Sequence, residues 1–165
     1  MPSKKLYVLR HGKSDWNSKF TMDHQRPLSD RGVEGAKLMG KHLSKIKQPP
    51  ELILSSTATR AFDTAKLANE EGEWGSTLLT SRHLYLTSVD EMIEQIKLID
   101  DTVERLMIVS HEPSCSELIS EVCMGAYVKF PTAALARIDF RVDKWSAVKA
   151  NKGQLAWLLT PKSLK

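Results

Sequence analysis

The sequence predicts an α/β fold, a three-layer α/β/α sandwich with a mostly parallel central sheet. Short apolar runs alternate with segments of helical periodicity, and each of the first three runs is followed by polar residues. Hydrophobic residues make up 41% of the 165 residues, which is enough for one sizeable core. We therefore expect a single domain over residues 1–165.

The first predicted unit is a buried strand at residues 6–9 followed by a helix. Ser29 is placed to cap this helix, because a serine hydroxyl can accept a hydrogen bond from a free backbone NH of the first turn. Pro49 and Pro50 stop the helix, since proline lacks the backbone donor and restrains the residue before it. The apolar stripe of the helix is expected to consist of Ala36, Met39, Leu43 and Ile46.

The second predicted unit begins with a strand at residues 52–54. A polar triplet at residues 55–57 leads into a second helix, and Gly72 and Gly75 mark the end of that helix. Its inner face is expected to carry Ala58, Ala61, Phe62, Ala65 and Ala68.

Two further helices are predicted from capping boxes, in which a serine and a glutamate three residues later satisfy each other's free backbone NH groups. One box is Ser88 with Glu91, and the other is Ser114 with Glu117. We therefore expect one helix to begin after each of these serines.

Three more strands are predicted in the second half of the chain. Residues 106–109 form a third buried apolar run. The segments 134–140 and 154–159 are predicted to be strands that pair as a hairpin at a sheet edge.

Composition and charge exclude several classes of protein. The formal net charge is +4 with scattered lysines, which favours anionic substrates but not nucleic acid. No apolar stretch approaches the roughly 20 residues that span a membrane, and we find no secretory signal, so we expect a cytoplasmic protein that does not bind membranes. Cys115 and Cys123 are too few for a disulfide framework and lack zinc-ribbon spacing, and they fall on one apolar helix face. We expect two buried thiols.

Cationic and imidazole side chains stand at the carboxyl ends of the three buried strands. Arg10 and His11 follow the first strand. Arg60 lies one turn into the helix after the second strand, and His111 follows the third. Each has an ordinary structural explanation when taken singly. Because ligands of open α/β sheets bind beyond the carboxyl ends of parallel strands, their common position predicts a phosphate site.

The predicted site has the groups that phosphoryl transfer needs. The guanidinium forks of Arg10 and Arg60 match phosphate oxygens. We expect His11 to attack phosphorus through a neutral ring nitrogen, because nearby positive charge disfavours its protonation, and to form a phosphohistidine that water hydrolyses. His111, once protonated, would stabilise charge on the transferred group. Gly12 is expected to let the loop turn closely past the ligand.

Four motifs extend this pattern. They are Arg10-His11-Gly12 followed by Ser14, Trp16 and Asn17; Pro27-Leu28-Ser29-Asp30-Arg31-Gly32 with Ala36; Ser55-Ser56-Thr57-Ala58-Thr59-Arg60-Ala61 with Thr64-Ala65; and Val109-Ser110-His111-Glu112-Pro113. In this order they resemble the histidine phosphatase superfamily, whose fold is also called phosphoglycerate mutase-like.

The resemblance implies a role for each matching residue. His11 is the phosphorylated nucleophile, Arg10 and Arg60 clamp the phosphate, and His111 is the second pocket histidine that also binds it. Asn17 is similar to a position that touches phosphate in many members. The family resemblance implies no cofactor.

Two features refine the expected substrate. The short chain and the segment 130–136 look most like the SixA group of phosphohistidine phosphatases. Mutases and acid phosphatases usually carry a pocket carboxylate as general acid, and the corresponding region, 83–88, has none. Asp90 is better explained as a helix N-terminal charge, while Asp15 and Glu112 stay open as proton donors. Because imidazole leaves phosphohistidine with less help than an alkoxide leaves an ester, the missing acid favours a P–N bond.

Other functions stay open beside a phosphatase that acts on a phosphorylated protein. The substrate could be a small phosphorylated metabolite. The chain could also be a non-catalytic phosphoprotein-binding module, although a binder has no need for His11. A metal hydrolase built on His11 and His111 is disfavoured, because the arginines would repel a cation and no third ligand is evident.

Overall fold

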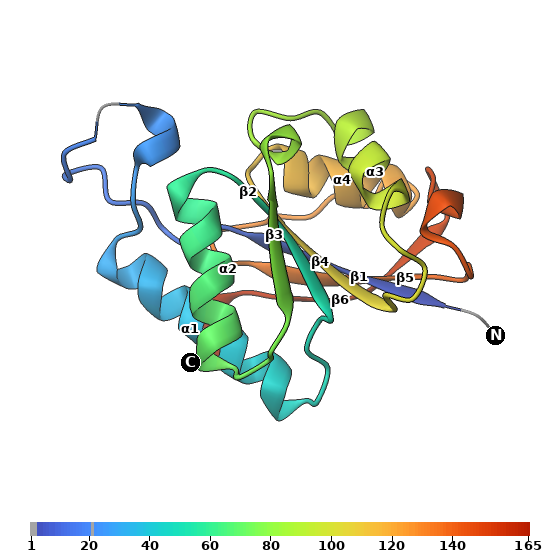
Figure 1. Ribbon diagram of the computed structural model, residues 1–165, viewed down its shortest axis with the longest axis horizontal. Helices are drawn as coiled ribbons and strands as arrows, with labels where there is room; N and C mark the ends of the chain where they lie inside the picture. Colours follow the sequence, from blue (N-terminus) through green and yellow to red (C-terminus); the bar gives the residue numbers. More distant parts are fainter. Residues whose placement is uncertain (1–2, 21) are drawn as a thin grey trace.

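The computed structural model describes residues 3–20 and 22–165, which form one six-stranded sheet (Figure 1). Its strands are β1 (Lys4–Arg10), β2 (Leu52–Ser56), β3 (Thr77–Ser81), β4 (Arg105–Ser110), β5 (Leu135–Phe140) and β6 (Gly153–Leu159). They lie in the order β3-β2-β4-β1-β5-β6. Neighbours pair in parallel from β3 to β1, whereas β5 pairs antiparallel with both β1 and β6. This confirms the predicted mostly parallel sheet and the hairpin at its edge.

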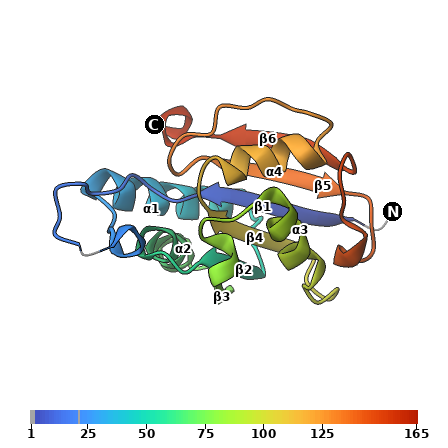
Figure 2. The same cartoon turned by 90° about the horizontal axis from the view of Figure 1, so that it is seen from above.

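The four α-helices of the described chain cover both faces of the sheet (Figure 2). Helices α1 (Asp30–Lys45) and α2 (Thr59–Glu71) cover one face, and α3 (Val89–Lys97) and α4 (Ser114–Val122) cover the other. The predicted three-layer sandwich is therefore confirmed. None of these helices has the length and hydrophobicity that a membrane span requires. Short 3-10 helices are η1 (Asp23–Gln25), η2 (Arg82–Leu84), η3 (Trp145–Ala147) and η4 (Pro161–Leu164).

The central strand β1 is buried on both faces. Tyr7 and Leu9 pack in the core beneath α1 and α2, whereas Leu6 and Val8 pack in the core beneath α3 and α4. This division follows from the two-residue period of a strand. Each face of β1 is thus held by a separate apolar cluster.

The pairing register brings the carboxyl ends of three parallel strands to one level. Arg10, the last residue of β1, lies opposite Ser110, the last residue of β4. Ser55 of β2 lies opposite Val109 of β4. The residues that follow these strands, together with the N-termini of α2 and α4, therefore meet at one sheet edge.

The predicted cap by Ser29 is present, and half of the predicted capping box at Ser88 is present. The Ser29 hydroxyl accepts a hydrogen bond from the backbone NH of Gly32 at 3.2 Å and caps α1. The Ser88 hydroxyl accepts from the NH of Glu91 at 3.2 Å. The Glu91 carboxylate, however, lies 2.7 Å from Nδ1 of His83 and does not complete the capping box.

The predicted capping box at the start of α4 is wrong. Ser114 is already helical, and its hydroxyl donates to the carbonyl of Thr87 at 2.9 Å. The Glu112 carboxylate takes the capping role by accepting from the backbone NH of Ser116 at 2.7 Å. A carboxylate is favoured there because it faces the positive end of the helix dipole.

Two other differences concern burial. Strand β3 has no sequence signal that predicts it, because this edge strand is mostly exposed and lacks a buried apolar run. Phe62 is only partly buried, whereas Ala61 and Ala65 beside it are fully buried in the core.

The two cysteines are free and buried, as predicted. Cys115 belongs to the apolar face of α4, and Cys123 follows the end of that helix. Burial raises the pKa of both thiols, that of Cys123 to about 11. Both therefore stay protonated at neutral pH and act as small apolar side chains.

Replacing Gly40 with alanine should destabilise the packing of α1 against α2. A Cβ at Gly40 would lie 2.3 Å from the carbonyl oxygen of Ala68, and neither helix backbone can yield cheaply. We expect the free energy of unfolding to fall by roughly 2–3 kcal/mol in urea denaturation. The matched control is Gly35→Ala in the same helix, where a Cβ would meet side chains rather than backbone, Ala133 at 3.2 Å and Pro161 at 3.6 Å. A control as destabilised as Gly40→Ala would contradict the prediction.

Candidate active site

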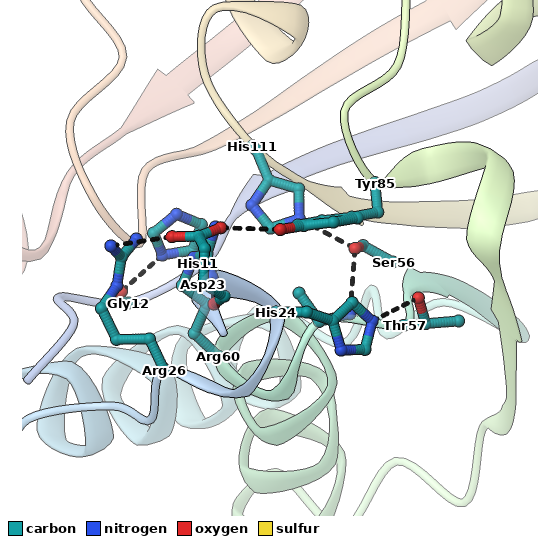
Figure 3. Close-up of polar contacts among 11 residues, drawn as sticks. His11, Gly12, Asp23, His24, Arg26, Ser56, Thr57, Arg60, Tyr85 and His111 are labelled. Carbon is teal, nitrogen blue, oxygen red and sulfur yellow. Dashed lines mark hydrogen bonds and ion pairs between the residues drawn. The ribbon is translucent and has the colours of Figure 1, made fainter. Parts of the chain in front are cut away.

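The carboxyl edge of the sheet holds a cavity of about 450 Å³ that contains the four residues identified at the strand ends. Arg10 and His11 come from the end of β1 and the residue after it. Arg60 comes from the first turn of α2, and His111 comes from the loop between β4 and α4 (Figure 3). The remaining lining residues are Lys13, Ser14, Trp16, Arg26, Arg31, Glu112 and Thr132.

His11 is 7% exposed, and one hydrogen bond fixes its ring. Nδ1 lies 2.6 Å from the carbonyl oxygen of Gly12. Because a carbonyl only accepts, Nδ1 carries the proton and Nε2 keeps its lone pair. Burial, together with the charges of Arg60 and Arg10, outweighs this hydrogen bond and lowers the pKa of His11 to about 4. The ring is therefore neutral and nucleophilic at pH 7.

His111 lies beside His11, with the two ring centroids 5.1 Å apart. Its Nε2 is 2.8 Å from the hydroxyl of Ser56 at the end of β2. Burial, followed by the proximity of His11 and Arg60, lowers the pKa of His111 to about 3. Among the described residues, Nδ1 of His111 has no hydrogen-bond partner. Protonation of this ring therefore requires nearby negative charge, such as that of a phosphoryl group.

Four arginines line the cavity, namely Arg10, Arg26, Arg31 and Arg60, and no sequence pattern singles out Arg26 as a site residue. Arg60 and Arg26 are 5% and 6% exposed. Arg10 donates to the carbonyl of Phe130 at 3.1 Å. The Nε atoms of Arg10, Arg26 and Arg60 are buried without a partner in the described part of the chain. Each guanidinium thus keeps an uncommitted donor, and the one sequence signal for Arg26 is its place directly before Pro27 of the second motif.

A carboxylate that the sequence patterns do not single out, Asp23, pairs with two arginines of the cavity. Asp23 lies in η1, within the loop between β1 and α1. Its Oδ2 accepts from Arg60 at 3.0 Å and from the hydroxyl of Tyr85 at 2.8 Å, and its Oδ1 pairs with Arg26 at 2.9 Å (Figure 3). The pair with Arg26 is local, three residues along the chain, whereas only the tertiary fold brings Asp23 to Arg60 and Tyr85.

Asp23 is a counterion of Arg26 and Arg60 and is not suited to act as a general acid. Partial burial would raise the pKa of this carboxyl, but the Tyr85 hydroxyl and the charges of Arg60 and Arg26 hold the pKa below its usual value. The carboxylate is therefore ionised at neutral pH and has no proton to give.

Gly12 lies where two backbone segments pack in direct contact. A Cβ at this position would lie 2.5 Å from the backbone oxygen of Gly32, so the loop after β1 packs directly on the start of α1. The NH of Gly12 also donates to the hydroxyl of Thr64 in α2 at 2.9 Å. Close backbone approach alone therefore requires a glycine here, while its passage close to a ligand stays a prediction.

The other candidate residues lie less centrally. Asn17 is exposed and outside the cavity lining, and its NH donates to Asp15 at 2.9 Å, so its contact with phosphate stays a prediction. Asp90 is exposed in the first turn of α3. Glu112 lines the cavity, but its carboxylate caps α4. Among the described residues, no three His, Cys, Asp or Glu side chains form a group that could hold a metal ion.

Replacing His11 with asparagine should flatten the pH dependence of stability. The unfolded chain binds a proton at this histidine near pH 6.5, whereas folded His11 stays neutral down to about pH 4. The free energy of unfolding therefore falls as the pH drops through this window, by roughly 1–2 kcal/mol between pH 7 and 5 for this residue. The variant should lack that loss in urea denaturation at the two pH values. Equal losses in both proteins would contradict the assigned charge state.

Comparison with known proteins agrees with this geometry. The model of the histidine phosphatase superfamily (branch 1) matches residues 6–82. The chain is 30% identical over 166 residues to the uncharacterized protein ML1117 of Mycobacterium leprae, covering 93% of this chain and 100% of that protein.

Two solved structures have similar folds. Protein histidine phosphatase SixA complexed with tungstate has a TM-score of 0.85 and 24% identity, covering 98% of this chain and 99% of that one. Mycobacterial glucosyl-3-phosphoglycerate phosphatase has a TM-score of 0.65 and 17% identity, covering 93% and 97%. On the family match, the full-length relative and the fold, the chain belongs to the histidine phosphatase superfamily.

Proposed function

We propose that the protein is a phosphatase that transfers the phosphoryl group of a protein phosphohistidine first to His11 and then to water. One observation carries the proposal. The buried, neutral His11 ring is held through Nδ1 by Gly12, which leaves Nε2 free beside Arg60 and His111. Superfamily membership supports phosphatase activity, and the likeness to SixA supports a phosphohistidine protein as the substrate.

In the first step, the lone pair on Nε2 of His11 attacks phosphorus, and the P–N bond to the substrate imidazole breaks. The electron pair of that bond stays on the substrate nitrogen, which takes a proton from solvent. Arg10, Arg60 and Arg26 donate hydrogen bonds to the phosphoryl oxygens and hold the group in line with the attacking nitrogen. His111 gains a proton more readily once the phosphoryl charge is bound, and then adds a further donor.

In the second step, water attacks the phosphorus of phospho-His11. The bond to Nε2 breaks, and its electron pair returns to the ring, so that His11 regains the neutral form in which it began. One proton of the water stays on the released phosphate and the other passes to solvent or buffer. The arginines and His111 stabilise the same charge distribution in both steps.

The ionised state of Asp23 supports a P–N substrate. An alkoxide leaving a phosphate ester benefits from a positioned proton donor by about 10²- to 10⁴-fold, and the Asp23 carboxylate has no proton to supply. The imidazolate that leaves a phosphohistidine is a weaker base than an alkoxide, so it needs less help from a positioned acid and takes its proton from water. The site is therefore better matched to phosphohistidine than to an alkyl phosphate.

A small phosphorylated metabolite is the second candidate substrate. A similar fold occurs in mycobacterial glucosyl-3-phosphoglycerate phosphatase, whose name gives it a metabolite substrate. The same cavity, nucleophile and arginines would serve that reaction. A non-catalytic phosphoprotein-binding module is disfavoured, because phosphate recognition alone has no use for the free Nε2 of His11.

Covalent labelling tests the proposed nucleophile. Wild-type protein quenched during reaction with a radiolabelled phosphohistidine protein should carry a label that is stable to base and labile to acid. His11→Ala should carry no label and should turn over at least about 10³-fold more slowly. His83→Ala, a control at a partly exposed histidine outside the cavity, should keep both properties. Undiminished turnover by His11→Ala would overturn the proposal.

Asp23→Asn separates a counterion from a general acid. Removing the charge frees Arg60 and Arg26, so we expect tungstate to inhibit roughly three- to ten-fold more tightly while phosphohistidine turnover changes little. Asp15→Asn, in the same loop but outside these ion pairs, should bind tungstate as the wild type does. A loss of about 10²-fold or more confined to an alkyl phosphate ester would instead identify Asp23 as the acid.

A further inference from the structure

A second cavity, also of about 450 Å³, lies next to the phosphate-binding one. It is formed by the first half of α1, the loop 129–133 and the C-terminal residues 160–165, and we name it the α1 groove. Lys13, Arg31 and Thr132 line both cavities. A substrate whose phosphoryl group occupies the first cavity can therefore extend into the α1 groove.

The position of the α1 groove relative to the nucleophile is fixed by the backbone. Ala133 adopts a left-handed conformation with φ 58°, and its NH donates to the carbonyl of His11 at 2.9 Å. The loop that separates the two cavities is thus anchored on His11 itself. Whatever binds in the groove is held at a set distance from the reacting phosphorus.

The floor of the α1 groove is apolar and shallowly packed. Leu38, Pro131 and Pro161 are partly buried there. Gly35 presents no side chain, and a Cβ on it would lie 3.2 Å from the Cβ of Ala133. Such a surface suits the backbone and aliphatic carbons of an extended peptide.

The rim of the α1 groove is strongly positive. Glu34 is the one carboxylate among its described lining residues, and it lies 4.0 Å from Lys165. Lys165 is one of five cationic residues in the lining, and the other four have no carboxylate within 4.0 Å in the described part of the chain. The five cationic residues that line the groove are Lys13, Arg31, Lys129, Lys162 and Lys165.

We propose that the α1 groove binds an acidic segment of the substrate protein that adjoins its phosphohistidine. Carboxylates of that segment meet the unpaired lysines, and its backbone lies along the apolar floor. Charge complementarity and the wall shared with the phosphate cavity favour this occupant over an unrelated ligand. The inference rests on the proposed function, because it requires a protein substrate.

The test compares two phosphohistidine peptides of equal length, one with Asp and Glu beside the phosphohistidine and one with Asn and Gln in their place. Phosphoimidazole serves as the substrate without a flank. The variant is Lys129→Glu/Lys162→Glu, which changes the groove but not the phosphate cavity. The control is Lys149→Glu/Lys152→Glu, which makes the same charge change at a separate cavity. The segment between β5 and β6 that carries these lysines lies at the opposite end of the molecule from the C-terminus (Figures 1 and 2).

We expect the wild type to have a kcat/KM about ten-fold or more higher for the acidic peptide than for the amide peptide. The groove variant should lose this preference, the control should keep it, and both should hydrolyse phosphoimidazole like the wild type. The inference is wrong if the groove variant keeps the preference for the acidic peptide. It is equally wrong if the control loses that preference to the same extent, because the preference would then come from the net charge of the whole protein and not from the groove. The inference is also wrong if the groove variant hydrolyses phosphoimidazole as poorly as it hydrolyses the acidic peptide, because phosphoimidazole has no flank to bind. Wild-type protein that hydrolyses none of the three compounds would instead refute the proposed function.

Discussion

The parallel register of β1, β4 and β2 is the constraint on which the candidate site depends. It sets Arg10 opposite Ser110, so that His11 and His111 leave their strands at the same level. A slip of one residue would displace one histidine by about 3.3 Å and turn alternate side chains to the wrong face. The two rings, now 5.1 Å apart, would separate. Burial of β1 side chains in the two cores on opposite faces of the sheet prevents that slip. Core packing therefore fixes the position of His11 relative to His111.

Burial, reinforced by nearby positive charge, keeps both histidines neutral. Burial of the His11 and His111 rings disfavours their charged forms. The guanidinium group of Arg60, which is 5% exposed, adds to this effect at both rings, and that of Arg26, which is 6% exposed, adds to it at His11. The result is a pair of neutral histidines. In the proposed mechanism, His11 attacks through its free Nε2 and His111 accepts a proton when a phosphoryl group binds. Each role follows from the surroundings, because the two side chains are chemically identical. The fold assigns those roles by giving His11 a carbonyl partner and His111 a hydroxyl partner.

Sequence patterns predict what is periodic or local in this protein. The apolar runs and helical stripes predict the sandwich, and the residues after three strands predict Arg10, His11, Arg60 and His111 at one edge. The edge strand β3 is missed because most of its side chains face solvent, so its sequence has no buried apolar run. Asp23, Arg26 and Tyr85 are missed because the segment around η1 meets Arg60 of α2, and Tyr85 just after η2, only in the folded chain. The cap of α4 is missed because Glu112, rather than the predicted Ser114, reaches the helix terminus.

The ion pair of Asp23 with Arg60 explains how the cavity keeps its cations in place before a substrate binds. The Arg60 side chain is 6% exposed, whereas that of Asp23 is 47% exposed, so a buried cation is joined to a carboxylate that still touches water. Solvent makes such a pair worth little by itself, yet a buried guanidinium without any partner would be costly. A phosphoryl group offers more charge and more acceptor atoms than the carboxylate, and it meets donors that are already oriented. The loop before α1 thus holds the arginines in a binding arrangement, so that little ordering is left for the substrate to impose.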